Sequence, residues 1–376
     1  MKILITVATY YPDVDGVQNV TEYQAENLVK MGNSVTVVAS NERGKYITKE
    51  KHNGVNIIRF NAYNSKTLHH GDKKKYQDLV LQLASHCDVM INVCLESFAA
   101  DWLLPILDKF NCKKVLINHG MQEFGLRSKK NSGLLDKAKE IIKDIRWGIF
   151  YKKYWNNIAN YDEYVFLHEM DYARLFFIQH GIPRSKTHVI YNAVPNIFFD
   201  KCRKKNQIIN VGTFGDRKNQ KLCLKSFYKA STKDYSLVLI GRPNNRYYNK
   251  LLSLNKHLSE RYGAKDVKIL SNVDRKETID LIKQSRIYLL TSKIEKFPIS
   301  LIESMASGSA FVSTDVGIVK NFPGGYVCDK KSEIIDKINL LIKKDPTYQG
   351  AIARSYAIDN FDEKQQVKKL ESILKK

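Results

Sequence analysis

The stretch Glu295-Lys296-Phe297-Pro298-Ile299-Ser300-Leu301-Ile302-Glu303 decides the fold of this chain. A polar segment carries one carboxylate, a proline follows, and an apolar run carries a second carboxylate eight positions after the first. Proline is tolerated in the first turn of a helix, where its missing N–H group costs nothing. The pattern therefore predicts a helix from Ile299 to about Ala306, with Gly308 just beyond its end.

Apolar segments on both sides of this helix predict strands, at residues 285–292 before it and 310–313 after it. The result is a β-loop-α-β unit with Glu295 in the loop and Glu303 inside the helix. A helix N-terminus at the edge of a sheet presents N–H groups and about half a unit of positive charge, which suits a phosphate. A phosphate-bearing ligand is therefore expected at Phe297, Pro298 and Ile299.

The segment resembles the E-x7-E motif of retaining glycosyltransferases of the GT-B fold, family 4, including the Met305-Ala306 pair, Gly308 and the turn ending at Gly317. Lys296 departs from the family, which usually has glycine there. The resemblance implies an α/β, GT-B architecture: two Rossmann-like, doubly wound parallel-sheet domains face a central cleft, and a C-terminal helix crosses back. The alternative is an ordinary β-α-β unit with no shared chemistry.

The whole chain has 376 residues and an ordinary apolar fraction of 43%, which predicts two or three domains. No run of eighteen apolar residues occurs, and the N-terminus begins a strand at once, so neither a transmembrane helix nor a signal peptide is expected. The six cysteines lack metal-ligand or disulfide spacing. We expect a cytoplasmic protein with reduced thiols.

The charge is unusual, because 61 basic and 39 acidic residues give a net charge of +22. Such a surface attracts nucleic acid, anionic lipid or phosphorylated substrates, and composition does not choose among them. No zinc-finger spacing, RNP-like motif or helix-turn-helix pattern is present. We therefore expect no nucleic-acid partner.

The first domain is predicted to begin with a strand at residues 1–7, a loop, a helix at 18–31 and a strand at 34–39. The loop lacks G-x-G-x-x-G, which disfavours dinucleotide binding. In the glycosyltransferase family this loop is rich in glycine and lies against the donor phosphates; here Asp15-Gly16 replaces the usual glycine pair. Gly16 is a donor-binding candidate, and a plain turn is the alternative.

Further strands are predicted at 55–60, 89–95 and 115–118, and helices at 73–85 and 99–110, so the sheet is parallel. Ligands in such folds bind beyond the carboxyl ends of the strands. His119 follows one such end, and the family has a donor-contacting histidine after this strand. A structural histidine is the alternative.

Residues 127–155 interleave nine Lys or Arg with five aromatic residues. Basic groups among aromatics are typical of a helix lying on an anionic membrane. The alternative is a solvated helix whose aromatics pack inward. We expect peripheral contact with the inner face of the cell membrane.

Residues 181–194 resemble the interdomain stretch of the family, with Ala193 in place of a glycine, and the basic run near 192–204 indicates a linker. The predicted domains are an acceptor-binding domain, 1–191, and a nucleotide-sugar-binding domain, 192–355. The third segment, 356–376, contains a terminal helix that packs back on the first domain.

The second domain is predicted to open with a strand at 208–212, a loop through Arg217 and Lys218, and a helix at 222–230. Basic residues at such a junction can neutralise a diphosphate leaving group without metal. The usual arginine of the family is replaced by Thr213, so whether Arg217 substitutes stays open; a solvated helix start is the alternative. The resemblance also implies donor contacts at Gly241 and Val273.

The resemblance implies a retaining, metal-independent hexosyl- or N-acetylhexosaminyltransferase without a cofactor, with a UDP-sugar as the expected donor. Lys218 would hold the diphosphate, Glu303 the ribose and Glu295 the sugar hydroxyls, and His119 would lie beside the reacting carbon. The expected acceptor is a glycan or lipid-linked glycan in bacterial surface polysaccharide synthesis. The alternatives are an epimerase or phosphorylase-like enzyme, and a non-catalytic glycosyltransferase-like partner subunit.

Overall fold

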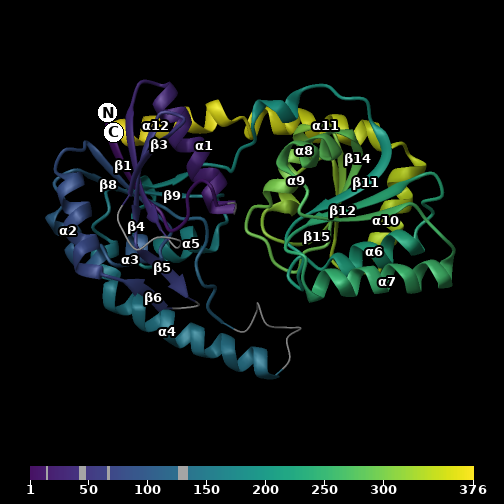
Figure 1. The fold of residues 1–376 in the computed structure, drawn as a ribbon, viewed down its shortest axis with the longest axis horizontal. Coiled ribbons are helices and arrows are strands. Elements are labelled where there is room, and N and C mark those ends of the chain that lie inside the picture. Colours follow the sequence, from purple (N-terminus) through teal and green to yellow (C-terminus); the bar gives the residue numbers. More distant parts are fainter. Residues whose placement is uncertain (14–15, 42–47, 66–67, 126–133) are drawn as a thin grey trace. The chain divides into compact units, whose positions relative to one another are not determined.

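The computed structural model describes residues 1–13, 16–41, 48–65, 68–125 and 134–376. The chain forms two compact units, Met1–Tyr191 with Gln366–Lys376, and Asn192–Gln365. Each unit is built around one mainly parallel sheet that is covered by helices (Figure 1). Asp15 and residues 127–133, to which the sequence analysis gave roles, lie outside the described residues.

The first unit contains an eight-stranded sheet in the order β10-β9-β8-β7-β1-β2-β4-β3. All neighbouring strands in it are parallel except β3 and β4. A separate antiparallel pair consists of β5 and β6. The strands are β1 (Lys2–Thr6), β2 (Ser34–Ser40), β3 (Thr48–His52), β4 (Val55–Phe60), β5 (Ala62–Ser65), β6 (Leu68–Gly71), β7 (Val89–Val93), β8 (Lys113–Ile117), β9 (Glu163–Phe166) and β10 (Thr187–Val189).

The side chains of these strands alternate between two apolar cores, as the pleat of a strand requires. Ile3 and Ile5 lie in one core with Leu28 and Leu370 of two helices, α1 and α12, whereas Leu4 lies in the other core. That second core is covered by α2, α3, α4 and α5. The helices are α1 (Gly16–Lys30), α2 (Lys73–Ala84), α3 (Phe98–Asp101), α4 (Leu134–Ile158), α5 (Tyr172–Gln179) and α12 (Glu363–Lys375), with 3-10 turns at η1 (Leu104–Lys109) and η3 (Arg184–Lys186).

The second unit contains a six-stranded sheet in the order β13-β12-β11-β14-β15-β16, and all its neighbouring strands are parallel. In the strands β12 and β14 the buried residues 237–240 and 287–290 form continuous apolar runs, as expected for a parallel sheet covered on both faces. The strands are β11 (Lys205–Val211), β12 (Ser236–Gly241), β13 (Val267–Ser271), β14 (Ser285–Leu290), β15 (Ala310–Thr314) and β16 (Gly325–Cys328).

Helices cover both faces of this second sheet (Figure 1). On one face α6, α7 and α10 share an apolar core with Leu237 and Leu289. On the other face α9 contacts α11, β14 and β15, and α8 contacts β11. The helices are α6 (Gln220–Lys229), α7 (Arg246–Tyr262), α8 (Arg275–Gln284), α9 (Ile299–Ala306), α10 (Glu333–Lys343) and α11 (Pro346–Asn360), with 3-10 turns at η4 (Asn196–Phe199) and η5 (Val319–Asn321).

The predicted elements around the opening stretch are confirmed, because β14, α9 and β15 follow one another and Gly308 has a positive φ of 80° just past α9. The predicted helix at 99–110 is wrong. It is divided into α3 and η1, since Pro105 lacks an N–H group for a continuous helix.

The interpretation of residues 192–204 as a linker is also wrong. Phe198 is completely buried, and the Phe199 carbonyl accepts a hydrogen bond from Arg354 of α11. This segment therefore packs within the second unit. The second unit continues to Gln365, beyond the predicted limit at 355, because α11 runs through Asn360.

The last turns of α12 are part of the first unit. Val367, Leu370, Ile373 and Leu374 lie in its core, and Lys113 Nζ donates to the Ile373 carbonyl at 2.6 Å. Among the described residues, none of the helices combines the length and apolar character needed to cross a bilayer.

Candidate functional site

The predicted site residues of the second unit lie at one edge of its sheet. Gly212 and Lys218 follow β11, Gly241 ends β12, Val273 follows β13, and Glu295 follows β14. Because these strands are parallel, their carboxyl ends lie at the same edge, which is where open α/β sheets bind ligands.

An ion pair joins two of these loops. Lys218 Nζ lies 2.6 Å from Glu295 Oε1, and the two side chains are only 15% and 7% exposed. The loops are also joined through the backbone, since Lys293 N–H donates to the Arg217 carbonyl at 2.8 Å. A buried ammonium and carboxylate each need the other, so loss of either leaves an uncompensated charge. The structure thus brings Lys218 and Glu295 together across 77 residues of sequence.

The first turn of α9 is anchored to β11. Ser300 Oγ donates to the Val211 carbonyl at 3.1 Å and lies 2.6 Å from the Tyr288 hydroxyl. Burial raises the pKa of Tyr288 far above its ordinary value, so this hydroxyl stays protonated. The helix begins at Ile299, as the sequence predicted, and Pro298 is the residue just before it rather than part of its first turn. The amino end of α9 is therefore fixed at the carboxyl edge of the sheet.

Phe297 is a core residue in this arrangement. Its side chain is 5% exposed, and its ring meets those of Phe322 and Phe361 with centroids 5.7 and 5.8 Å away. The ring therefore has no free face for a ligand, so Phe297 can contribute to a ligand site only through its backbone. Ile299, by contrast, is half-buried at the start of the helix.

Glu303 is paired with a cation that the sequence analysis did not identify. Its side chain is 4% exposed and forms an ion pair with Arg275, which is half exposed at the start of α8. The Arg275 guanidinium also lies over the Phe198 ring, 5.4 Å from its centroid. Because Glu303 is buried on its helix, the cation from α8 compensates its charge. No local sequence pattern relates Arg275 to Glu303, because the two residues lie on separate helices.

Two glycines allow backbone segments to approach closely at this edge. A Cβ atom on Gly241 would lie 2.5 Å from the Gly212 carbonyl oxygen. Gly317 has φ +55°, and a Cβ there would lie 2.8 Å from the Glu295 carbonyl oxygen. A side chain at either position would displace the loops that carry Lys218 and Glu295.

The remaining predicted residues are more loosely placed. Arg217 is exposed and Val273 is half-buried. Gly16 begins α1, and His119 is half-buried after β8; both belong to the first unit. Next to His119, Asn118 is completely buried and its Oδ1 accepts a hydrogen bond from Gly120 N–H at 3.1 Å. This bond shapes the turn at the carboxyl end of β8.

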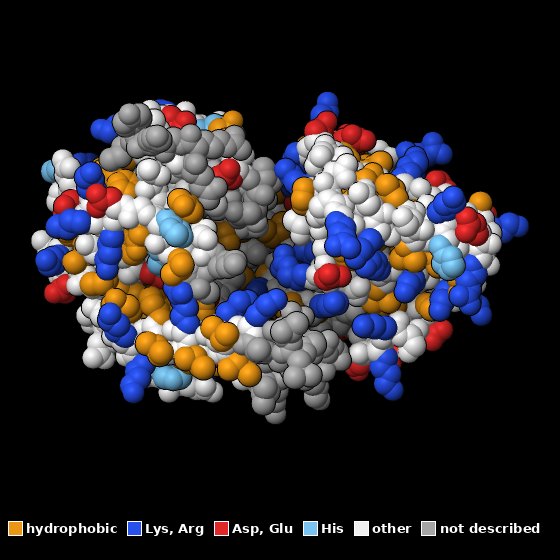
Figure 2. Space-filling view, turned by 60° about the horizontal axis from the view of Figure 1, so that its bottom comes forward, with side chains coloured by type: hydrophobic (Ala, Val, Ile, Leu, Met, Phe, Trp, Pro, Cys, Tyr) orange, Lys and Arg blue, Asp and Glu red, His pale blue; other side chains and the backbone are white. Residues whose placement is uncertain are grey.

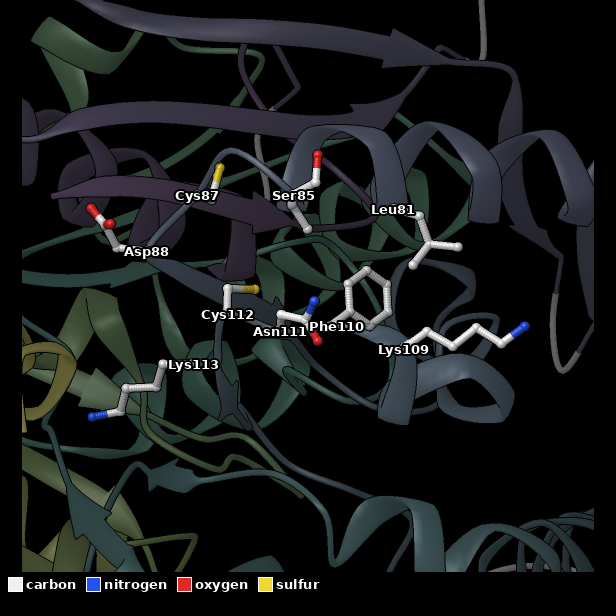
Figure 3. A pocket seen from close by; sticks show the side chains of 10 residues that line it. Leu81, Ser85, Cys87, Asp88, Lys109, Phe110, Asn111, Cys112 and Lys113 are labelled. Atoms are coloured by element: carbon white, nitrogen blue, oxygen red, sulfur yellow. The ribbon is translucent and has the colours of Figure 1, made fainter.

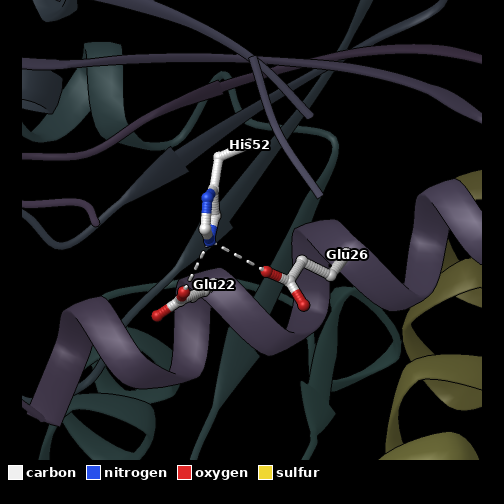
Figure 4. A group of neighbouring side chains, drawn as sticks. All are labelled: Glu22, Glu26 and His52. Carbon is white, nitrogen blue, oxygen red and sulfur yellow. Dashed lines mark ion pairs between the residues drawn. The ribbon is translucent and has the colours of Figure 1, made fainter. Parts of the chain in front are cut away.

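Glu22, Glu26 and His52 form a group outside these loops (Figure 4). Among the described residues it is the group with metal-ligand atoms in mutual reach, all within 4.8 Å. His52 Nε2 lies 3.6 Å from a Glu22 oxygen and 3.8 Å from a Glu26 oxygen, while Tyr11 stacks on the imidazole ring. Burial raises the pKa of Glu22. The contacts join the end of β3 to α1.

A cavity of about 310 Å³ lies at the amino ends of strands of the first sheet, opposite the carboxyl ends where His119 lies (Figure 3). It is lined by residues just before β7 and β8, including Cys87, Asp88 and Cys112, and so adjoins the amino ends of the strands. Burial raises the pKa of both thiols, which keeps them protonated near neutral pH. The cavity is therefore remote from the carboxyl end that carries His119.

The comparisons with known proteins agree with this geometry. Residues 197–374 match the model of the family described as glycosyl transferases group 1. The match includes the segments that carry both ion pairs. A search of curated proteins by sequence finds no significant match.

Solved structures match the entire chain. Sucrose-phosphate synthase from Thermosynechococcus elongatus superposes with a TM-score of 0.72 and 13% identity, over 100% of this chain and 98% of that one. The fold is GT-B. A UDP-forming trehalose-phosphate synthase from Burkholderia xenovorans gives 0.69 and 13%, over 100% and 98% of the two chains. Anabaena HepE, in complex with UDP and glucose, gives 0.70 and 14%, over 100% and 99%.

Proposed function

We propose that this protein is a retaining glycosyltransferase that uses a nucleotide-sugar donor bound by its second unit. The observation that carries the proposal is the buried Lys218–Glu295 pair beside the amino end of α9. A cation and a helix N-terminus suit a diphosphate, and the neighbouring carboxylate suits sugar hydroxyls. The family match over residues 197–374 supports the same assignment.

In the proposed donor complex Lys218 and the first N–H groups of α9 hold the diphosphate. As the bond between the sugar and the diphosphate breaks, negative charge grows on the departing oxygen, and fixed positive groups stabilise it most at that moment. The entering diphosphate competes with Glu295 for the Lys218 ammonium. Glu295 is then available to accept hydrogen bonds from the donor sugar.

The nucleoside half of the donor is assigned to the other ion pair. Glu303 would accept hydrogen bonds from the ribose hydroxyls, while Arg275 balances its buried charge. Gly241 and Val273 would border the nucleotide, and exposed Arg217 would add positive charge near the phosphates. UDP is the first nucleotide to test, because structural relatives of this chain are described as UDP-forming or as bound to UDP.

For the transfer itself we assign no metal and no cofactor. The acceptor oxygen forms a bond to the anomeric carbon on the face from which the diphosphate leaves, and the acceptor proton passes to the departing phosphate oxygen. Configuration is thereby retained. His119 and Gly16 of the first unit are the residues proposed to lie beside the sugar and the phosphates. The transferred group would be a hexose or an N-acetylhexosamine.

The proposed acceptor is a glycan or a lipid-linked glycan used in bacterial surface polysaccharide synthesis, at the cytoplasmic face of the cell membrane. The excess of basic residues supports an anionic acceptor or surface. A non-catalytic partner subunit is the competing function, and it requires no donor turnover.

The test is turnover of UDP-, GDP- and ADP-sugars by the full chain, with and without EDTA, measured as release of the nucleoside diphosphate. We expect one donor class to be consumed, by wild type but not by Lys218→Ala, and the product to keep the anomeric configuration of the donor by NMR. Inversion would refute the retaining mechanism, and inhibition by EDTA would refute metal independence. A folded protein that consumes none of the donors, even with bacterial lipid extract added, would favour the partner subunit.

A further inference from the structure

Helix α4 exposes a row of isoleucines. Ile141, Ile142, Ile145 and Ile149 are 45%, 67%, 59% and 63% exposed. They account for four of the large hydrophobic side chains that the described part of the chain exposes, and they fall within three turns of one helix. Single exposed apolar residues need no explanation, but a contiguous group marks an interaction surface.

The geometry of the helix separates this row from its packed face. At about 100° per residue, the four isoleucines fall within an arc of about 100°. Trp147, Tyr151 and Ile158 point the other way, and their side chains are 5%, 3% and 0% exposed. The helix thus has two apolar faces, of which one packs on the first unit and the other has no partner among the described residues.

Charge is distributed to match. Lys139, Arg146 and Lys153 lie along one border of the isoleucine row, and exposed Lys152 continues the row at its carboxyl end. The acidic Asp144 instead lies near the border facing the body of the unit, where its oxygens accept from Gln122 Nε2 at 2.9 Å and Gly125 N–H at 3.4 Å. In Figure 2 the bottom of Figure 1, where α4 lies, is turned toward the viewer. On this face hydrophobic side chains form a row, and Lys and Arg side chains lie beside it.

We infer that this surface, the isoleucine row of α4 with its basic border, docks on an anionic lipid bilayer. Isoleucines would enter the boundary between head groups and acyl chains, and the lysines and arginine would contact anionic head groups. The row spans about 12 Å along the helix from Ile141 to Ile149, so α4 would lie parallel to the membrane surface. A second copy of this chain fits less well, because it would bring a like-charged border to a chain of net charge +22.

The structure changes the reason for membrane contact. The sequence interpretation relied on aromatics among basic residues, and that part is wrong, because Trp147 and Tyr151 are core residues of the first unit. The inference deepens the proposed location at a membrane, but it does not depend on catalysis. Binding to vesicles and turnover of a soluble donor can therefore fail separately.

The test is sedimentation of the full chain with vesicles of phosphatidylcholine, with or without about one-third phosphatidylglycerol. Wild type should partition to the anionic vesicles. Ile142→Ser/Ile145→Ser/Ile149→Ser should weaken that partition at least about tenfold. Lys139→Gln/Arg146→Gln/Lys152→Gln/Lys153→Gln should lose the preference for anionic vesicles. The matched control Leu252→Ser/Tyr348→Ser/Ile358→Ser, which alters exposed apolar residues of the second unit, should bind like wild type.

Three results would overturn the inference. The first is that wild type does not sediment with anionic vesicles. The second is that the isoleucine variant binds these vesicles as well as wild type, which would leave net charge as the cause of binding. The third is that wild type forms a dimer in sedimentation velocity, that the isoleucine variant does not, and that neither protein binds vesicles. Release of nucleotide from a soluble donor by the isoleucine variant at the wild-type rate confirms that it is folded.

Discussion

Helices α9 and α4 are both rich in apolar residues, yet they use them differently. In α9, Leu301, Ile302 and Met305 are completely buried, and even its carboxylate, Glu303, is almost inaccessible. In α4 one apolar face is buried and the other, formed by four isoleucines, is exposed. An apolar side chain is buried only where the fold supplies a partner. The comparison suggests that α9 is built to hold a site rigidly, whereas α4 keeps a surface open for an external partner.

The largest expected effect is on the stability of the folded protein, and it should differ between substitutions in α9 and in α4. Leu301→Ala removes a fully buried side chain from α9 and should lower the free energy of unfolding by about 2–5 kcal/mol. Ile145→Ala in α4, where the side chain is 59% exposed, should change it by less than about 0.5 kcal/mol. Urea unfolding followed by circular dichroism measures both variants. A similar loss for both would mean that the isoleucine row is packed in solution.

The next effect concerns the ion pair beside α9. Lys218→Gln should reduce donor turnover by about 100-fold or more, because it removes positive charge from the departing diphosphate and leaves Glu295 buried without its cation. Lys225→Gln, at an exposed position of the α6 helix that follows this loop, is the matched control and should keep wild-type turnover. Equal rates for the two variants would remove Lys218 from the site.

A smaller effect is expected at Arg275. Arg275→Gln should weaken nucleotide binding by about tenfold, since Glu303 loses the charge that balances it in the interior. Lys276→Gln alters an exposed neighbour and should leave binding unchanged. Fluorescence titration with the preferred nucleotide compares them. Unaltered affinity in Arg275→Gln would show that the pair only stabilises α9.

The smallest effect is expected at Lys204. Lys218 is paired with a carboxylate, whereas the Lys204 ammonium donates to neutral oxygens. Lys204 Nζ donates to the Ser285 carbonyl at 2.8 Å and to Ser309 Oγ at 3.2 Å, and burial lowers its pKa to about 7 from 10.5. Between these two values the unfolded chain binds more protons than the folded one, so stability should rise with pH across this window and the cost should be complete below it.

Lys204→Met should therefore flatten the pH dependence. The free energy of unfolding of Lys204→Met minus that of wild type should be larger at pH 6 than at pH 10, by at least about 1 kcal/mol. At pH 6 wild type carries the cost of the buried charge, and the variant does not. Lys205→Met, at the exposed neighbouring residue, serves as the control. A pH profile of Lys204→Met parallel to that of wild type would show that this amine keeps its ordinary pKa.

The sequence predicted α9 well because local signals agreed there. Pro298 and Gly308 bound the helix, and continuous apolar runs gave β14 and β15. The meeting of Lys218 with Glu295 could also be anticipated, since both follow parallel strands and β11 pairs with β14. Such rules act over a few residues or between neighbouring strands.

Other features depend on tertiary packing that no local signal encodes. The ion pair of Arg275 with Glu303 requires α8 to lie beside α9. In α4, aromatics and isoleucines recur on two faces of the helix, and only packing against the first unit decides which face is buried. The segment 192–204 has a basic, polar composition typical of linkers, but buried Phe198 ties it to the second unit.

The proposed donor site is tested by calorimetric titration of the full wild-type chain, and of Lys218→Gln and Arg275→Gln, with UDP, GDP and ADP. We expect one nucleotide to bind wild type at a single site and both variants to bind it more weakly, Lys218→Gln most of all. A folded wild-type protein that binds none of the three, or variants that bind as tightly as wild type, would contradict a donor site at the carboxyl edge of the second sheet.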